Sequence, residues 1–233
     1  MSASGGPDLI TNNLVFHVDA SNPRCYSGGS VCRDLTNING NGTITNVSLS
    51  SDKAFLMNTN TSKISFTRSF VNVTSNFTYS CLISSSSNSF GLILNSMYNA
   101  GGIDDGIILF KDNSFLSATS YSVLLDMVAA GGGDQIQTAF PGVLINQKAL
   151  ITASYKNNIM KIYLNGILIN SQFTVYNIDN QNLINLGASS YPDSFYYLTE
   201  AGLKIYQASI YNRGLDDGEV LQNYNSLKTR YKI

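Results

Sequence analysis

Short runs of alternating apolar and polar residues recur along the chain, and clusters of Asn, Gly, Ser and Asp separate them. In the run 14–19, for example, Leu14, Phe16 and Val18 fall on one face of an extended strand. Runs of the same kind cover 63–66, 77–83, 90–94, 106–110, 122–127, 149–155, 160–164, 167–170, 183–188 and 203–211. Because no helical run lies between these segments, the pattern predicts antiparallel β-sheets and excludes a parallel α/β sheet.

Turn residues mark the connections between the predicted strands. Asn165-Gly166 favours a two-residue type I′ turn, because both positions of that turn need a positive φ. Together with the turn at 156–158, this pair predicts a three-stranded meander over 149–170. Two glycine-rich stretches, 101–106 and 129–134, are predicted to be loops.

One helix is predicted, at the C-terminal end of the chain. Asp216 is placed to act as its N-cap, and Glu219 stands three residues later, as in a capping box. An apolar stripe at helical spacing follows, formed by Val220, Leu221, Tyr224 and Leu227. The stripe predicts that the helix packs against the sheets with Leu221 facing them.

Four segments of the sequence carry a family resemblance. They are LVFHVDASNP at 14–23, Asp34-Leu35 followed by Asn-Gly-Thr at 41–43, KIYLNG at 161–166, and IYNRGLDDGEVLQNY at 210–224. In this order they resemble the concanavalin A-like, laminin-G-like domains, most closely those of phage and other viral structural proteins. The resemblance implies an all-β fold, an antiparallel jelly-roll β-sandwich with one short C-terminal helix. An N-terminal arm, residues 1–13, is expected to precede a single domain, residues 14–233.

Such a scaffold serves sugar binding, glycan hydrolysis and plain architecture, and the fold alone does not choose among them. At Cys32 this sequence departs from the family, which commonly has an aromatic residue there, often Trp. That departure favours architecture over sugar stacking.

Charge and hydropathy exclude several classes of partner. The 233 residues include 14 basic and 15 acidic ones, and charged residues make up 12% of the chain, about half the usual 25%. Because no basic stripe is present to neutralise phosphates or anionic lipid, neither nucleic acid nor a membrane surface is predicted as a partner. No apolar window reaches the length of about 20 residues that spans a membrane. The first residues also lack the basic and apolar regions of a secretion signal.

Candidate catalytic groups are few. Only two Glu occur, Glu200 and Glu219, and neither has a second carboxylate at the spacing that retaining glycosidases use. His17, the one His, shares a strand face with Asp19, which could orient its imidazole. No Gly-x-Ser-x-Gly motif accompanies it to supply a nucleophile. We therefore predict that the chain is not an enzyme.

Metal and thiol chemistry is weakly represented. One His and three scattered Cys give no transition-metal site, so no cofactor is predicted. Calcium has weak candidates in the acidic residues of the two glycine-rich stretches, Asp104, Asp105 and Asp134. Cys25 and Cys32 are seven residues apart and could form a disulfide, whereas Cys81 has no obvious partner, so the odd count favours free thiols.

One segment combines aromatic rings with a carboxylate, as sugar sites do. It is the Pro-containing run 191–197, in which the candidate ligand-binding residues are Tyr191, Asp193, Tyr196 and Tyr197. The same cluster fits a protein contact, because Tyr is enriched at interfaces. Both interpretations stay open.

Two functional hypotheses follow from the sequence. The first is a non-enzymatic virion structural protein, a capsid decoration, head-fibre or tail-associated subunit, located in the virion and assembled in the host cytoplasm. Its partners would be other virion proteins and further copies of itself, since low charge density opposes self-association only weakly. The alternative is a carbohydrate-binding adhesin or receptor-binding module that recognises surface glycans.

Overall fold

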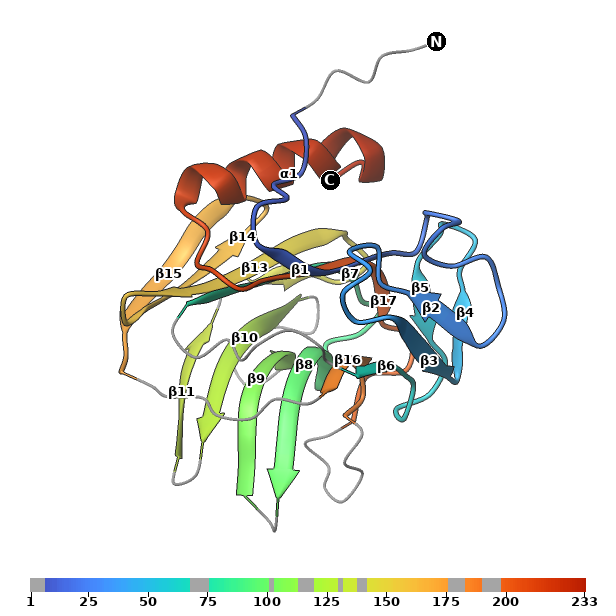
Figure 1. Ribbon diagram of the computed structural model, residues 1–233, viewed down its shortest axis with the longest axis horizontal. Helices are drawn as coiled ribbons and strands as arrows, with labels where there is room; N and C mark the ends of the chain where they lie inside the picture. Colours follow the sequence, from blue (N-terminus) through green and yellow to red (C-terminus); the bar gives the residue numbers. More distant parts are fainter. Residues whose placement is uncertain are drawn as a thin grey trace.

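The computed structural model describes residues 7–67, 76–100, 103–112, 120–129, 132–137, 142–175, 183–189 and 198–233. In this part of the chain, two antiparallel sheets lie face to face and one helix lies outside them (Figure 1). The predicted fold class, an all-β sandwich with one C-terminal helix, is confirmed.

The first sheet carries the helix on its outer face. Its strands are, in order, β15 (Ile167–Phe173), β14 (Ile159–Leu164), β13 (Ala149–Lys156), β7 (Phe77–Ser84), β17 (Lys204–Tyr211), β5 (Phe55–Met57) and β4 (Val47–Leu49), and β1 (Leu14–Asp19) also pairs with β17. The predicted meander is β13, β14 and β15, and its Asn165-Gly166 turn has φ values of 51° and 79°.

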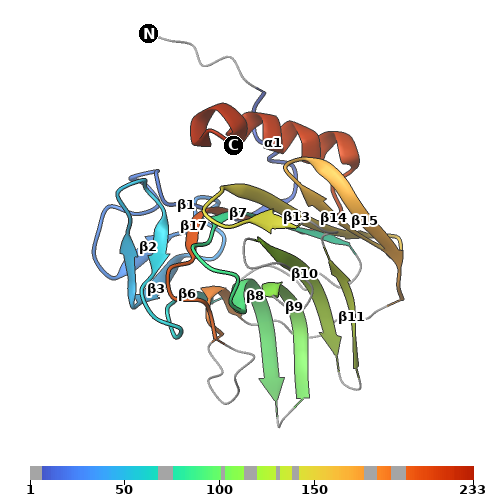
Figure 2. The same cartoon turned by 180° about the vertical axis from the view of Figure 1, so that it is seen from behind.

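The second sheet lies beneath the first, as the view from behind in Figure 2 also shows. Its strands are, in order, β11 (Gly132–Gln137), β10 (Ser120–Ala129), β9 (Ile103–Asp112), β8 (Gly91–Ala100), β16 (Leu183–Gly187), β6 (Lys63–Thr67), β3 (Asn41–Thr45) and β2 (Val31–Arg33), with β12 (Val143–Leu144) paired to β10. Strands β2 to β5 were not predicted, because they are only three to five residues long and carry no sustained alternation.

The two glycine-rich stretches contain more strand than the sequence predicts. β9 begins at Ile103 and β11 begins at Gly132, so Asp104, Asp105 and Asp134 lie in strands rather than in loops. For 103–106, 129 and 132–134 the loop prediction was wrong, because β9 pairs with β8 from its first residue and β11 pairs with β10. Residues 101–102 and 130–131 lie outside the described residues. Ladder hydrogen bonds from a neighbouring strand override the weak strand propensity of glycine.

The core fills the space between the sheets through one face of each strand. Along β9, Ile107 and Leu109 point into this core, whereas Phe110 belongs to a separate outer cluster. Phe16 of β1 meets Phe66 of β6 edge to face across the sandwich, with ring centroids 4.9 Å apart. The period of two that predicted the strands thus also places their core residues.

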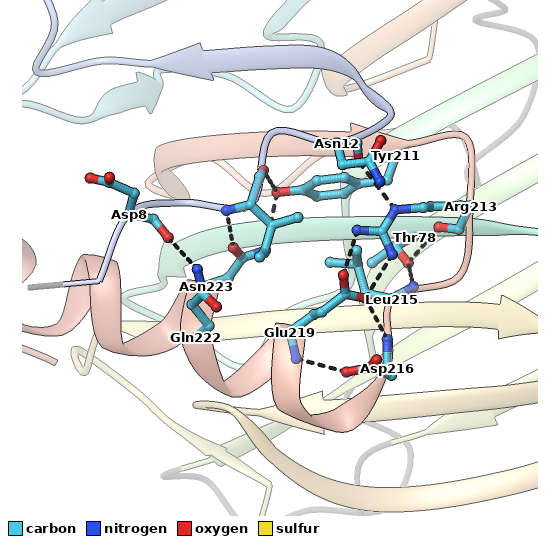
Figure 3. Close-up of polar contacts among 11 residues, drawn as sticks. Asp8, Asn12, Thr78, Tyr211, Arg213, Leu215, Asp216, Glu219, Gln222 and Asn223 are labelled. Carbon is cyan, nitrogen blue, oxygen red and sulfur yellow. Dashed lines mark hydrogen bonds and ion pairs between the residues drawn. The ribbon is translucent and has the colours of Figure 1, made fainter.

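Helix α1 (Asp217–Tyr231) begins at the predicted capping box. The Asp216 carboxylate accepts from the Glu219 N–H at 2.9 Å, and the Glu219 carboxylate accepts from the Asp216 N–H at 3.1 Å (Figure 3). The buried side chains of the helix are Val220, Asn223, Leu227 and Tyr231. No helix in the described ranges is long and apolar enough to cross a membrane.

The prediction that Leu221 faces the sandwich was wrong, since 45% of this residue is exposed. The buried face runs through Asn223 instead. Its amide oxygen accepts from the Ile10 N–H at 2.8 Å, and its amide nitrogen donates to the Tyr211 hydroxyl at 3.0 Å. A search for apolar residues alone misses such a position, because the polar side chain is buried with its hydrogen bonds satisfied.

The described part of the predicted N-terminal arm, 7–13, lies along α1 (Figure 3). The Asp8 carbonyl accepts from the Gln222 side chain at 2.9 Å, and the Asn12 carbonyl accepts from Arg213 at 3.1 Å. The Tyr211 hydroxyl donates to the Ile10 carbonyl at 2.9 Å. These contacts hold the arm against both the helix and the end of β17. The boundary between arm and domain at 13/14 stays a prediction.

Candidate functional site

A hollow of about 680 Å³ with a mixed polar and apolar lining lies where the arm, β1 and α1 meet. We call it the α1 hollow. Three lining residues come from the arm, two from β1 and five from the C-terminal half of the helix: Pro7, Asp8, Leu9, His17, Asp19, Asn225, Ser226, Leu227, Thr229 and Arg230. The hollow therefore depends on the docking of both chain ends against the outer face of the first sheet.

Asp19 joins β1 to the end of α1. Its buried carboxylate accepts from the Tyr231 hydroxyl and the Ser21 hydroxyl, both at 2.8 Å, and forms an ion pair with Arg230 at 2.7 Å. The Arg230 side chain remains 47% exposed. A guanidinium has five N–H donors, so Arg230 can bind a ligand in the hollow while it keeps its contact with Asp19.

His17 is held by β17 and not by Asp19. Its Nδ1 lies 2.9 Å from the Ser209 hydroxyl and 3.3 Å from the amide nitrogen of Gln207. The Asp19 carboxylate, which the sequence suggested as its partner, is engaged by Tyr231, Ser21 and Arg230. Ser209 is instead the residue that β17 pairs directly with His17.

Burial lowers the pKa of His17 below its ordinary value of 6.5, although the nearby Asp19 and Asp34 carboxylates oppose the shift and Arg230 adds to it. In the unfolded chain the imidazole binds a proton more readily than in the folded chain, so folding stability is expected to fall as the pH drops through 6.5. Urea unfolding at about pH 7.5 and about pH 5.5 measures this loss. His17→Gln is the control, and we expect it to flatten the dependence. An equally steep dependence in this variant would contradict the assignment to His17. Folding also lowers the pKa values of the Asp217 and Glu219 carboxyls, but this changes the stability only below their ordinary pKa values of 3.8 and 4.5. These two groups therefore add nothing to the pH dependence between the two measured pH values.

A second charged centre lies inside the sandwich, and sequence reasoning missed it. The Lys111 ammonium donates to the Glu200 carboxylate, to the Ser85 hydroxyl at 2.5 Å and to the Ser87 carbonyl at 2.9 Å. It also lies 4.5 Å from the centre of the Tyr121 ring. Lys111 lies on the same strand face as Ile107 and Leu109, but the run 107–110 is apolar throughout, so the sequence does not indicate that this face is the inner one.

This ion pair is sealed from solvent. The side chains of Lys111 and Glu200 are 0% and 4% exposed, and burial lowers the pKa of Lys111 even though Glu200 opposes the shift. Ser85 and Ser87 each donate to Glu200 at 2.6 Å, so the pair ties the segment after β7 to the second sheet. A centre without solvent access fits a structural role better than contact with a ligand.

The site residues predicted from the sequence fall largely beyond what the structure describes. Tyr191, Asp193, Tyr196 and Tyr197 lie outside the described residues. The backbones of Asp104 and Asp105 in β9 and of Asp134 in β11 are separated by β10, and their side chains lie outside the described ones as well. Among the residues that are described, no three His, Cys, Asp or Glu form a group that could hold a metal ion. Calcium binding therefore stays a prediction.

The three cysteines are free thiols in this structure, and all are buried. The Sγ atoms of Cys25 and Cys32 lie 3.5 Å apart, so the two residues that the sequence paired are neighbours in space. Cys81 lies in the main core.

Comparisons with known proteins identify solved structures that share this fold. No protein-family model matches the chain, and no curated protein sequence does. Among solved structures, Trypanosoma rangeli sialidase in complex with sialic acid matches with a TM-score of 0.71 at 13% identity, over 98% of this chain and 35% of that one. The binding domain of botulinum neurotoxin serotype D matches with a TM-score of 0.67 at 16% identity, over 91% of this chain and 50% of that one. The binding domain of botulinum neurotoxin DC in complex with SialylT matches with a TM-score of 0.65 at 17% identity, over 94% and 52%.

The first of these structures corrects one prediction. The sequence predicted that the chain is not an enzyme, and this prediction is contradicted because the matching structures include sialidases. The sequence argument tested only carboxylate pairs and Ser-His-Asp sets within this chain, and the chain spans only about a third of the sialidase length. Because sialidases share this fold over about a third of their length, the lack of those residue sets in this chain does not exclude enzymes as a class.

The comparisons also bear on the predicted resemblance. At 13–17% identity these matches establish the fold and nothing finer. None of the structures named above is a viral protein. The part of the prediction that the comparisons support is the lectin-like β-sandwich, and this is the fold of the chain.

Proposed function

We propose that this chain is a glycan-binding module and that the α1 hollow holds part of the glycan. The observation that carries the proposal is the composition of the hollow. Arg230, Asn225 and Thr229 offer hydrogen-bond donors and acceptors to sugar hydroxyls, and the half-buried Leu9 offers apolar contact to the C–H face of a sugar ring. Its volume of about 680 Å³ falls within the range of small-ligand sites.

The comparisons support binding over plain architecture. The matching sialidase structure contains sialic acid, and the matching botulinum neurotoxin DC binding domain contains SialylT. These ligands belong to those proteins, and this chain spans only a third to a half of their length. They favour the adhesin hypothesis over the virion structural protein. A location in the virion, contacts with other virion proteins and the homo-oligomer stay predictions from the sequence.

A glycan array with sialylated and asialo oligosaccharides tests the proposal. We expect binding by the wild-type chain, and a loss of at least about fivefold in affinity for the double variant Asn225→Ala/Thr229→Ala, since each lost hydrogen bond is worth about 0.5–1.5 kcal/mol. Both residues are exposed on the helix and Ala favours helix formation, so the variant is expected to fold.

Leu221→Ala is the matched control, because Leu221 is exposed on the same helix and does not line the hollow. We expect it to bind like the wild type. If no oligosaccharide binds, or if the double variant binds as well as the control, the proposal is wrong.

A further inference from the structure

A smaller hollow of about 280 Å³ lies between the segment that follows β1 and strand β2. Arg24 and Arg33 line it together with Ser27 and Gly28, and its one buried lining residue is Cys25. The Cys25 sulfur lies 3.4 Å from the backbone nitrogen of Asp19, which lines the α1 hollow. This contact links one lining residue of each hollow, and we call the smaller one the arginine hollow.

The two guanidinium groups of the arginine hollow have no carboxylate partner among the residues that the structure describes. The other arginines of those ranges do have one: Arg213 pairs with Glu219 and Arg230 pairs with Asp19. Two exposed arginines thus border one hollow, and their charge is not neutralised by described neighbours.

Asp34 follows Arg33 directly, but its own loop uses its carboxylate. Asp34 is buried. Its carboxylate accepts from the backbone N–H of His17 at 2.9 Å, the Thr36 hydroxyl at 2.6 Å and the Asn39 side-chain amide at 2.9 Å. The Asp34 carboxylate is therefore already engaged in hydrogen bonds and does not compete with a ligand for Arg33.

The backbone around the arginine hollow is held in place. The Arg33 N–H donates to the Cys25 carbonyl at 2.8 Å, and the Tyr26 hydroxyl donates to the Gly29 carbonyl at 3.1 Å. Gly28 has a φ of 106°, which side-chain-bearing residues rarely adopt, and a Cβ built there would meet nothing within 4 Å. These two hydrogen bonds stabilise the loop, and the space above Gly28 is open.

We infer that the arginine hollow is an anionic subsite of the glycan site, which binds the carboxylate of an acidic sugar. This inference rests on the proposed function and names the ligand class. Guanidinium groups bind carboxylates through paired, charge-assisted hydrogen bonds. Exposed Val31, also on the rim, offers apolar contact to the sugar. Sulfated sugars share the anionic chemistry, and the experiment separates them.

The test titrates the full chain with the methyl glycoside of N-acetylneuraminic acid and with the neutral methyl ester of that glycoside. We expect the acid to bind at least about tenfold more tightly than the ester, and Arg24→Gln/Arg33→Gln to remove this preference. Lys53→Gln/Lys156→Gln is the control, because it removes the same total charge from two exposed residues that do not line either hollow. It is expected to keep the preference.

The outcomes separate this inference from the proposed function. Equal binding of acid and ester, or an unchanged preference in the arginine variant, overturns the subsite. If neutral oligosaccharides still bind in that case, the glycan-binding module stands without the subsite. Arginine-dependent binding of a sulfated oligosaccharide without binding of the carboxylated sugar also overturns the inference, because the ligand class would be a sulfate. If no saccharide binds at all, both proposals are wrong.

Discussion

Replacing Lys111 by Met is expected to lower the free energy of unfolding by about 3–5 kcal/mol, because it leaves a buried carboxylate without its cation. The Glu200 side chain is only 4% exposed and has no other cationic partner among the described residues. The variant keeps the length and much of the apolar surface of the Lys side chain, so loss of packing adds little. Urea unfolding at neutral pH measures the effect.

The double variant Lys111→Met/Glu200→Gln is the control. It removes both charges and keeps an amide that can accept from one of the Ser85 and Ser87 hydroxyls and donate to the other; each hydroxyl lies 2.6 Å from a different Glu200 oxygen. We expect it to recover most of the lost stability, since replacing both members of a buried pair is often neutral. If Lys111→Met costs less than about 1 kcal/mol, the pair is not desolvated as the structure has it.

Truncating Leu227 to Ala is expected to cost about 2–5 kcal/mol of stability, as for other buried Leu side chains. Leu227 is buried with Leu82, Leu150 and Tyr206 beneath the helix. Leu221→Ala, at the exposed position, is expected to cost less than about 1 kcal/mol. Removal of the cap in Asp216→Ala should fall between them, at about 0.5–2 kcal/mol. Thermal melts of the three variants give the order, and a larger loss for Leu221→Ala than for Leu227→Ala would contradict the packing of α1.

Features encoded by neighbouring residues could be predicted from the sequence. The capping box needs only Asp216 and Glu219, and the Asn165-Gly166 turn needs only two residues with positive φ. The strands of the meander have clear alternation. In each case the residues that determine the feature lie close together in the sequence, so a short stretch of sequence is enough to predict it.

Features that depend on distant partners could not be predicted. Lys111 and Glu200 are 89 residues apart, and nothing near Glu200 in the sequence indicates a cation. Asn223 is buried because Ile10 and Tyr211 bond to it, one of them 213 residues away. The α1 hollow likewise combines the arm, β1 and the end of the helix. Such sites arise only when the fold brings distant segments of the chain together.

The most direct test of the central claim is a map of amide chemical shifts of the uniformly ¹⁵N-labelled chain during titration with a sialylated oligosaccharide. The account predicts saturable shifts that cluster at Asp19 in β1, at Asn225 to Arg230 in α1 and around Arg24 and Arg33. Amides of the edge strand β15 should not move. An absence of saturable shifts, or shifts confined to the 191–197 segment, would contradict the assignment of the glycan site to the two hollows.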